Sequence, residues 1–118
     1  MSITALHPGL AYGAGTASED LISGNFVRLS GADLFSKVND AADKAFGIVY
    51  RDTLTGNYVT VFTNGGVYET DTFSTGISAG DDLEIDPVTN LLRKATTGQV
   101  VGVALVVTGS ELKFKLVI

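Results

Sequence analysis

Residues 80–118 carry the pattern that most limits what this chain can fold into. Apolar residues alternate with charged ones along residues 82–86 and again along residues 112–118, and a two-residue period is typical of strands with one buried and one exposed face. Residues 100–107 are apolar on both faces and rich in β-branched side chains, which predicts a central strand. Together with a shorter strand at residues 91–95, this region is expected to form a four-stranded unit.

Short strands are also predicted in the first half of the chain. Glycine turns and apolar runs indicate strands at residues 24–29, 34–38, 46–50 and 58–62. The last two of these are expected to pair with each other across a turn at residues 55–57. A chain with so many short strands favours an all-β fold.

Two local signals in the first half point to turns. The Asn-Gly-Gly sequence at residues 64–66 is typical of a tight hairpin, and residues 67–70 are then expected to be its returning strand. Residues 39–45 are the only stretch with a helical bias, and Asn39 or Asp40 is suited to cap a single helical turn there.

The two halves share a layout of glycines and strands. Gly24 and Gly80 each precede a strand, and Gly47 and Gly102 each lie inside the later apolar strand of their half. A repeat of this kind predicts a small β-barrel or β-sandwich built from two similar β units. The alternative is that a glycine-rich β chain matches itself by chance.

Residues 1–22 differ from the remainder of the chain. Pro8 lacks a backbone donor for a ladder, and glycines at 13 and 15 add backbone freedom. We therefore expect an extended N-terminal arm at residues 1–22 and a β domain at residues 23–118. A frayed terminus is the alternative, but the segment is apolar for a tail that is only solvated.

The composition excludes several classes of function. The net charge of −5 disfavours binding to nucleic acid, because such binding requires lysine and arginine to neutralise phosphates. No apolar segment approaches the ~20 residues that cross a bilayer, and the N-terminus lacks the features of a signal peptide. We expect a soluble protein with no membrane partner that stays where it is made.

No set of residues predicts catalysis or a bound cofactor. His7 is the only histidine and the chain has no cysteine, whereas a metal site normally needs three or four ligands. The alternation places Asp82, Glu84 and Asp86 on the exposed face of a strand, so they are interpreted as solvated rather than as calcium ligands. The sequence thus predicts a protein that is not an enzyme, without metal or cofactor.

The second half resembles the capsid decoration proteins of tailed phages, also called cement or head-stabilising proteins. The likeness is carried by residues 77–85, by Leu92-Arg93-Lys94-Ala95 with Gly98, by residues 101–104 and by the alternating strand that closes the chain. It implies a homotrimer that binds the major capsid protein between capsomers, on the outer surface of the virion, and stabilises the head.

A binding mechanism follows from combining this resemblance with the apolar N-terminal segment. Each arm is expected to add a strand to a neighbouring capsid subunit, and three arms per trimer would strengthen weak single contacts. The expected capsid-binding residues of the arm are Ile3, Leu6, Pro8, Leu10 and Tyr12.

Rival interpretations come from other classes of protein. A carbohydrate- or cell-surface-binding β module would be a monomer with a groove lined by Tyr50, Tyr58 and Tyr68. Another virion or assembly component is a second alternative. A small hydrolase would need an acid–base pair that the sequence does not reveal.

Overall fold

A computed structural model describes residues 2–118 of the chain, and it is all-β with no helix among these residues. Met1, which the predicted arm includes, lies outside the described residues. No helix that could cross a membrane occurs within residues 2–118. The strands are β1 (Ile3–Tyr12), β2 (Thr16–Ala17), β3 (Phe26–Gly31), β4 (Leu34–Lys37), β5 (Gly47–Val49), β6 (Val61–Thr70), β7 (Asp82–Ile85), β8 (Leu92–Lys94), β9 (Gly102–Val107) and β10 (Leu112–Leu116).

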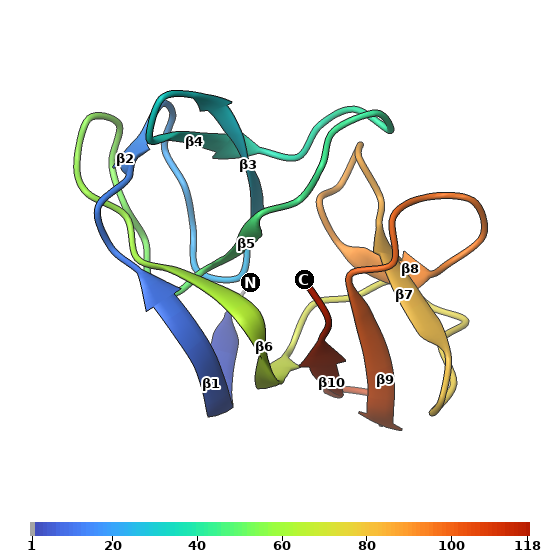
Figure 1. Cartoon of the computed structure of the whole chain (residues 1–118). Coiled ribbons are helices and arrows are strands. Elements are labelled where there is room, and N and C mark those ends of the chain that lie inside the picture. Colours follow the sequence, from blue (N-terminus) through green and yellow to red (C-terminus); the bar gives the residue numbers. More distant parts are fainter. Residues whose placement is uncertain (1) are drawn as a thin grey trace.

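All ten strands belong to one sheet, and β6 is its centre (Figure 1). One edge of β6 pairs along its length with β1, from Thr70 opposite Ile3 to Val61 opposite Tyr12. The other edge is shared, because β5 pairs with the first part of β6 and β10 with the last part. The N-terminal strand group (β2–β5) and the C-terminal strand group (β7–β10) therefore extend from two ends of the same strand.

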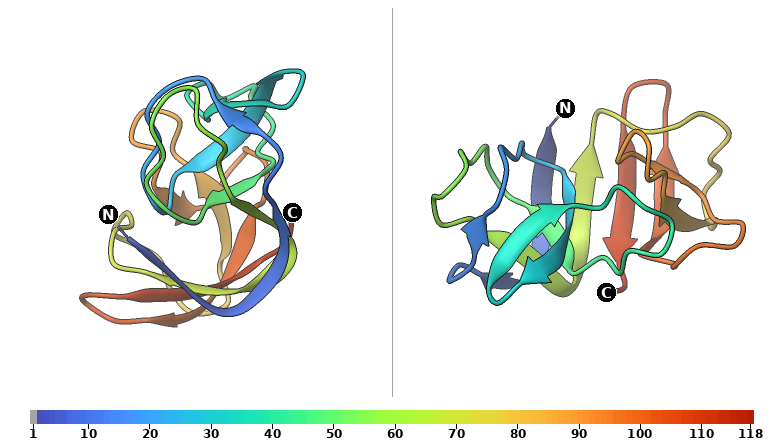
Figure 2. Two further views of the ribbon diagram at one scale, coloured as in Figure 1. Left: turned by 90° about the vertical axis from the view of Figure 1, so that its left-hand side faces the viewer. Right: turned by 90° about the horizontal axis from the view of Figure 1, so that it is seen from above.

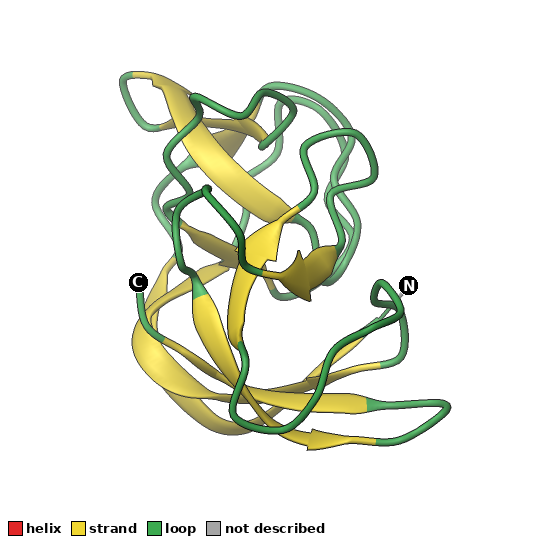
Figure 3. Cartoon of the chain, turned by 90° about the vertical axis from the view of Figure 1, so that its right-hand side faces the viewer, coloured by secondary structure: helices red, strands yellow, loops and turns green. Residues whose placement is uncertain are grey.

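The sheet bends strongly at β6, as Figures 2 and 3 show. Phe26 of β3 and Ile48 of β5 therefore share one core cluster with Leu83 of β7 and Phe114 of β10. The predicted division into two groups of strands is present, but the structure is one open sheet and does not confirm a closed barrel or a sandwich. The prediction of an arm at residues 1–22 and a domain at 23–118 stays a prediction. Residues 3–12 form β1 and pair with β6.

Two clusters of buried side chains stabilise this arrangement. The larger lies between the strand groups and includes four of the alternating residues predicted to face inward, each fully buried: Leu83, Leu112, Phe114 and Leu116. Ile85 and Ile118, the other two, are partly buried against this cluster. The smaller lies within the N-terminal group around Phe35. Burying each such side chain contributes about 1.5–3 kcal/mol to the stability of the fold. The alternating apolar residues therefore stabilise the sheet by leaving water on one of its faces.

The predicted hairpin at residues 64–66 is wrong. β6 continues through this stretch as one strand, and Asn64, Gly65 and Gly66 have φ values of 57°, 82° and 101°. Residues with positive φ are typical of tight turns, but they also allow a strand to bend sharply. Here they bend β6 at the point where its partner changes from β5 to β10.

Two further local predictions require correction. Residues 39–45 form a loop with one turn closed by the Asp43 amide and the Asp40 carbonyl, not a helical turn. Glu84 is not on a solvated face, because only 2% of it is exposed, although Asp82 is exposed as predicted. β9 is an inner strand, as expected, yet Leu105 and Val106 on it are exposed.

Candidate functional site

β1 is the candidate interaction strand, because it holds all five residues predicted to bind a partner. Leu6, Pro8 and Leu10 are exposed, with 40% of Leu6 and 66% of Leu10 accessible to solvent. Ile3 is buried in the larger core cluster, and Tyr12 is half-buried against Phe35 and Phe46. The structure thus brings three of the five to the surface.

β1 pairs only with β6 within residues 2–118, so its other edge is free of any strand of the chain. Its register is interrupted twice, between Ala5 and His7 and between Pro8 and Leu10. Bulges and proline restrict strand addition at an edge. The uninterrupted parts of the free edge are therefore the two ends of β1.

Polar contacts hold both ends of β1. The Ser2 amide and hydroxyl each donate to Asp71 at 2.9 Å. The Ser2 amide, followed by the hydroxyls of Thr72 and Ser2, lowers the pKa of Asp71 to about 2. At the other end, the Tyr12 hydroxyl donates to Asp33, and this hydrogen bond raises the pKa of Tyr12. The strand is thereby fixed in one position relative to the sheet.

The centre of β1 is fixed at the bend of β6. The Gly9 amide donates to the Tyr68 hydroxyl at 2.9 Å, and that hydroxyl donates to the Gly65 carbonyl at 3.2 Å. Tyr68 is fully buried, and its burial raises the pKa of its phenol. A Cβ atom on Gly66 would lie 2.4 Å from the Gly9 nitrogen, so the two strands touch here because both residues are glycines.

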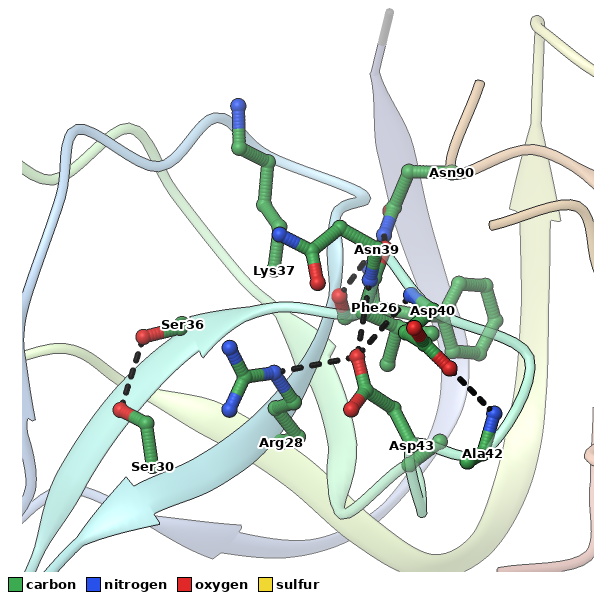
Figure 4. A network of polar contacts seen from close by, with 12 residues as sticks. Phe26, Arg28, Ser30, Ser36, Lys37, Asn39, Asp40, Ala42, Asp43 and Asn90 are labelled. Carbon is green, nitrogen blue, oxygen red and sulfur yellow. Dashed lines mark hydrogen bonds and ion pairs between the residues drawn. The ribbon is translucent and has the colours of Figure 1, made fainter. Parts of the chain in front are cut away.

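Asn90 joins the two strand groups through hydrogen bonds of its side chain (Figure 4). It lies in the turn between β7 and β8, is buried, and has a left-handed φ of 60°. Its side-chain nitrogen donates to the carbonyls of Phe26 and Val38 at 3.0 and 2.9 Å, and its side-chain oxygen accepts from the Phe26 amide at 2.7 Å. A C-terminal turn thus hydrogen-bonds with β3 and the end of β4.

The loop at residues 39–45 is organised by Asp43, as Figure 4 shows. The Asp43 carboxylate accepts from the amides of Asn39 and Asp40 at 3.0 and 3.1 Å. It also lies 3.1 Å from the buried Nε of Arg28, in an ion pair whose angles are not those of a hydrogen bond. The loop therefore has a defined shape despite its exposure.

The three tyrosines of the alternative hypothesis do not line a common groove. Tyr68 is fully buried, Tyr50 packs on Phe62 with ring centroids 5.0 Å apart, and Tyr58 is exposed. Among residues 2–118, no group of three or more His, Cys, Asp or Glu side chains is arranged to hold a metal ion.

Sequence reasoning missed Asn90, Glu84 and the contact between Gly9 and Gly66. For the contact between Gly9 and Gly66, the Asn-Gly-Gly sequence at residues 64–66 was the one available signal, because these residue types favour positive φ. Asn90 was assigned no role because its three partners are more than 50 positions away in the chain.

Comparison with known families gives one finding. The family model described as phage cement protein matches residues 11–117, which is most of the chain. A comparison with curated proteins finds no match.

Proposed function

Because the chain belongs to the phage cement protein family, and is therefore a structural protein of the virion capsid, we propose that it binds the outer capsid surface between capsomers and stabilises the head. The proteins of this family are generally not enzymes. The partner in this proposal is the major capsid protein, bound by a homotrimer.

The exposed apolar residues of β1 support this proposal most directly. Leu6, Pro8 and Leu10 lie on a strand that is held at both ends and has a free edge. Contiguous exposed apolar side chains mark protein interaction sites, and Leu6, Pro8 and Leu10 occupy every second position along one strand. We propose that these three contact the capsid directly, while Ile3 and Tyr12 fix β1 to the core and so position them.

Replacing both Leu6 and Leu10 with serine is expected to weaken capsid attachment at least about tenfold. Fully burying an exposed leucine contributes about 1.5–3 kcal/mol, Leu6 and Leu10 are 40% and 66% exposed and so together offer about one such side chain, and about 1.4 kcal/mol corresponds to a tenfold change in affinity. The measurement is co-sedimentation of the variant with capsids assembled without this protein, over a range of concentrations.

Val88→Ser is the matched control, because Val88 is 91% exposed but lies in the turn between β7 and β8. Its attachment is expected to equal that of the unchanged protein. Equal attachment of the Leu6/Leu10 double variant would contradict the role of β1. Substitution is a sharper test than deleting residues 2–12, since deletion also removes buried Ile3 and nearly all of the strand that pairs with one edge of β6.

Light scattering of the purified protein is expected to give three times the mass of the chain. A trimer presents three copies of β1, and simultaneous engagement raises the effective affinity by about 10²–10⁴. A monomer that also binds immobilised glycans would instead support the carbohydrate- or cell-surface-binding module.

A further inference from the structure

Glu84 is a buried carboxylate with every side-chain oxygen engaged. One oxygen accepts from the amides of Thr96 and Gly98 at 2.8 and 2.9 Å. The other accepts from Nε of Arg93 at 2.8 Å and lies 2.8 Å from a terminal nitrogen of the same guanidinium. The loop at residues 95–99 is therefore folded over β7 around this single side chain.

The same loop continues the connection into the N-terminal strand group. Gln99 accepts a hydrogen bond from the Ala45 amide at 2.9 Å through its side-chain oxygen. Ala45 ends the loop that Asp43 organises, and the next amide, that of Phe46, donates to Val27 of β3. A cavity of about 60 Å³ separates the two loops, so Gln99 is the direct polar contact between them.

We propose that ionised Glu84 is an acid-sensitive latch, which fixes the loop at residues 95–99 and, through Gln99, holds the loop at residues 39–46 against it. This device is independent of how the protein meets the capsid. Glu84 is therefore a positioning residue. Loss of its charge releases the loop at residues 95–99 and, with it, the facing loop of the N-terminal strand group.

The charge balance around Glu84 sets the direction of the pH dependence. Its pKa is lowered from the usual 4.5 mainly by the Thr96 amide, with smaller contributions from the Gly98 amide and Arg93. Arg93 also lies 3.5 Å from Asp86, and Asp40 and Asp43 line the cavity from the facing loop. Because the folded-state pKa is lower than the unfolded one, the stabilisation is present above about pH 4.5 and is lost as the pH falls through the folded-state value.

Amide hydrogen exchange, read residue by residue by NMR, tests the latch. Protection factors for Thr96 and Gly98 are expected to fall at least about tenfold between pH 7 and pH 3, because a local opening equilibrium controls exchange in such loops. Glu84→Gln is expected to show the low protection already at pH 7, with no further fall attributable to acid. Asp82→Asn, two residues away on the exposed part of β7, is the control and is expected to behave as the unchanged protein.

Unchanged protection of Thr96 and Gly98 in Glu84→Gln at pH 7 would overturn the proposal, as would an acid-induced fall of the same size in that variant. Gln99→Ala provides a second test that leaves Glu84 intact. It is expected to lower the protection of Ala45 at least about tenfold while Thr96 and Gly98 keep theirs. Full protection of Ala45 in Gln99→Ala would show that the loops are not coupled through this side chain.

Discussion

Replacing Gly66 with alanine is expected to destabilise the protein by about 2–5 kcal/mol, because two penalties combine. A residue with a Cβ atom pays about 1–2 kcal/mol to adopt a left-handed backbone, and Gly66 has a φ of 101°. The new Cβ would also lie 2.4 Å from the Gly9 nitrogen and 2.7 Å from the His7 carbonyl oxygen. Overpacking of this kind costs about 1–3 kcal/mol further, since β1 must move away from β6.

Urea unfolding followed by circular dichroism measures this effect, and two other glycines separate its causes. Gly76 has a φ of 85° with open space around it, so Gly76→Ala carries only the backbone penalty. Gly13 has open space and no positive φ, so Gly13→Ala is expected to be neutral or slightly stabilising. If Gly66→Ala loses no more stability than Gly76→Ala, the close contact between β1 and β6 does not matter.

The second large effect is expected at Asn90, where alanine should cost about 2–6 kcal/mol. The substitution leaves the Phe26 amide and the Val38 carbonyl without the partner they have now, whereas the Phe26 carbonyl keeps its hydrogen bond from the Val38 amide. A buried backbone group that loses its hydrogen bond costs about 1–3 kcal/mol. The left-handed φ of 60° adds a smaller penalty for alanine.

Asn64→Ala is the matched control for Asn90→Ala. Asn64 has a φ of 57° but is exposed, so its replacement carries the backbone penalty of about 1–2 kcal/mol alone. Asn90→Asp keeps the size of the side chain but replaces two N–H donors with an oxygen that faces two carbonyls. It is expected to be at least as destabilising as Asn90→Ala at neutral pH, and a loss no greater than that of Asn64→Ala in either variant would refute the role of Asn90.

These two sites have a shared consequence for the whole molecule. The bend of β6 sets the angle between the strand groups at the strand that both groups share, and Asn90 links the two groups a second time by hydrogen bonds. A sheet held at two separate points resists rotation of its halves. Such rigidity suits the proposed role, because a protein that stabilises a capsid must keep its contacts in fixed relative positions.

Most strand positions could be predicted from short stretches of sequence. The residues whose burial differs from the prediction do so for physical reasons. The strands predicted at residues 24–29, 34–38 and 46–50 correspond to β3, β4 and β5, because short apolar runs bounded by turn residues are typical of buried strands. Glu84 broke the pattern, since a loop from residues 95–99 covers the face that periodicity assigned to solvent. β9 differs in the opposite sense: Leu105 and Val106 were predicted to be buried but are exposed, because no element within residues 2–118 covers them.

The candidate site was predicted only in part. The sequence identified the apolar residues at the N-terminus, but not that residues 3–12 pair with β6, that Ile3 is buried, or that Leu6, Pro8 and Leu10 are the exposed members. Pairing between segments about 60 positions apart depends on which partner the folded sheet offers. No periodicity within a short window contains that information.

By itself, the sequence determined the all-β class, the inward-facing residues of β7 and β10, and the resemblance to capsid cement proteins, because each depends on neighbouring residues. The tertiary structure alone decided that residues 64–66 bend a strand and do not close a hairpin. Positive φ values are compatible with both outcomes, and the close approach of Gly9 together with the hydrogen bond from Gly9 to Tyr68 selects the bent strand. The same reason applies to Asn90, whose partners Phe26 and Val38 become neighbours only when the two strand groups fold over one core. It applies to Glu84 because Arg93, Thr96 and Gly98 reach its carboxylate only when β8 and the loop at residues 95–99 fold back against β7.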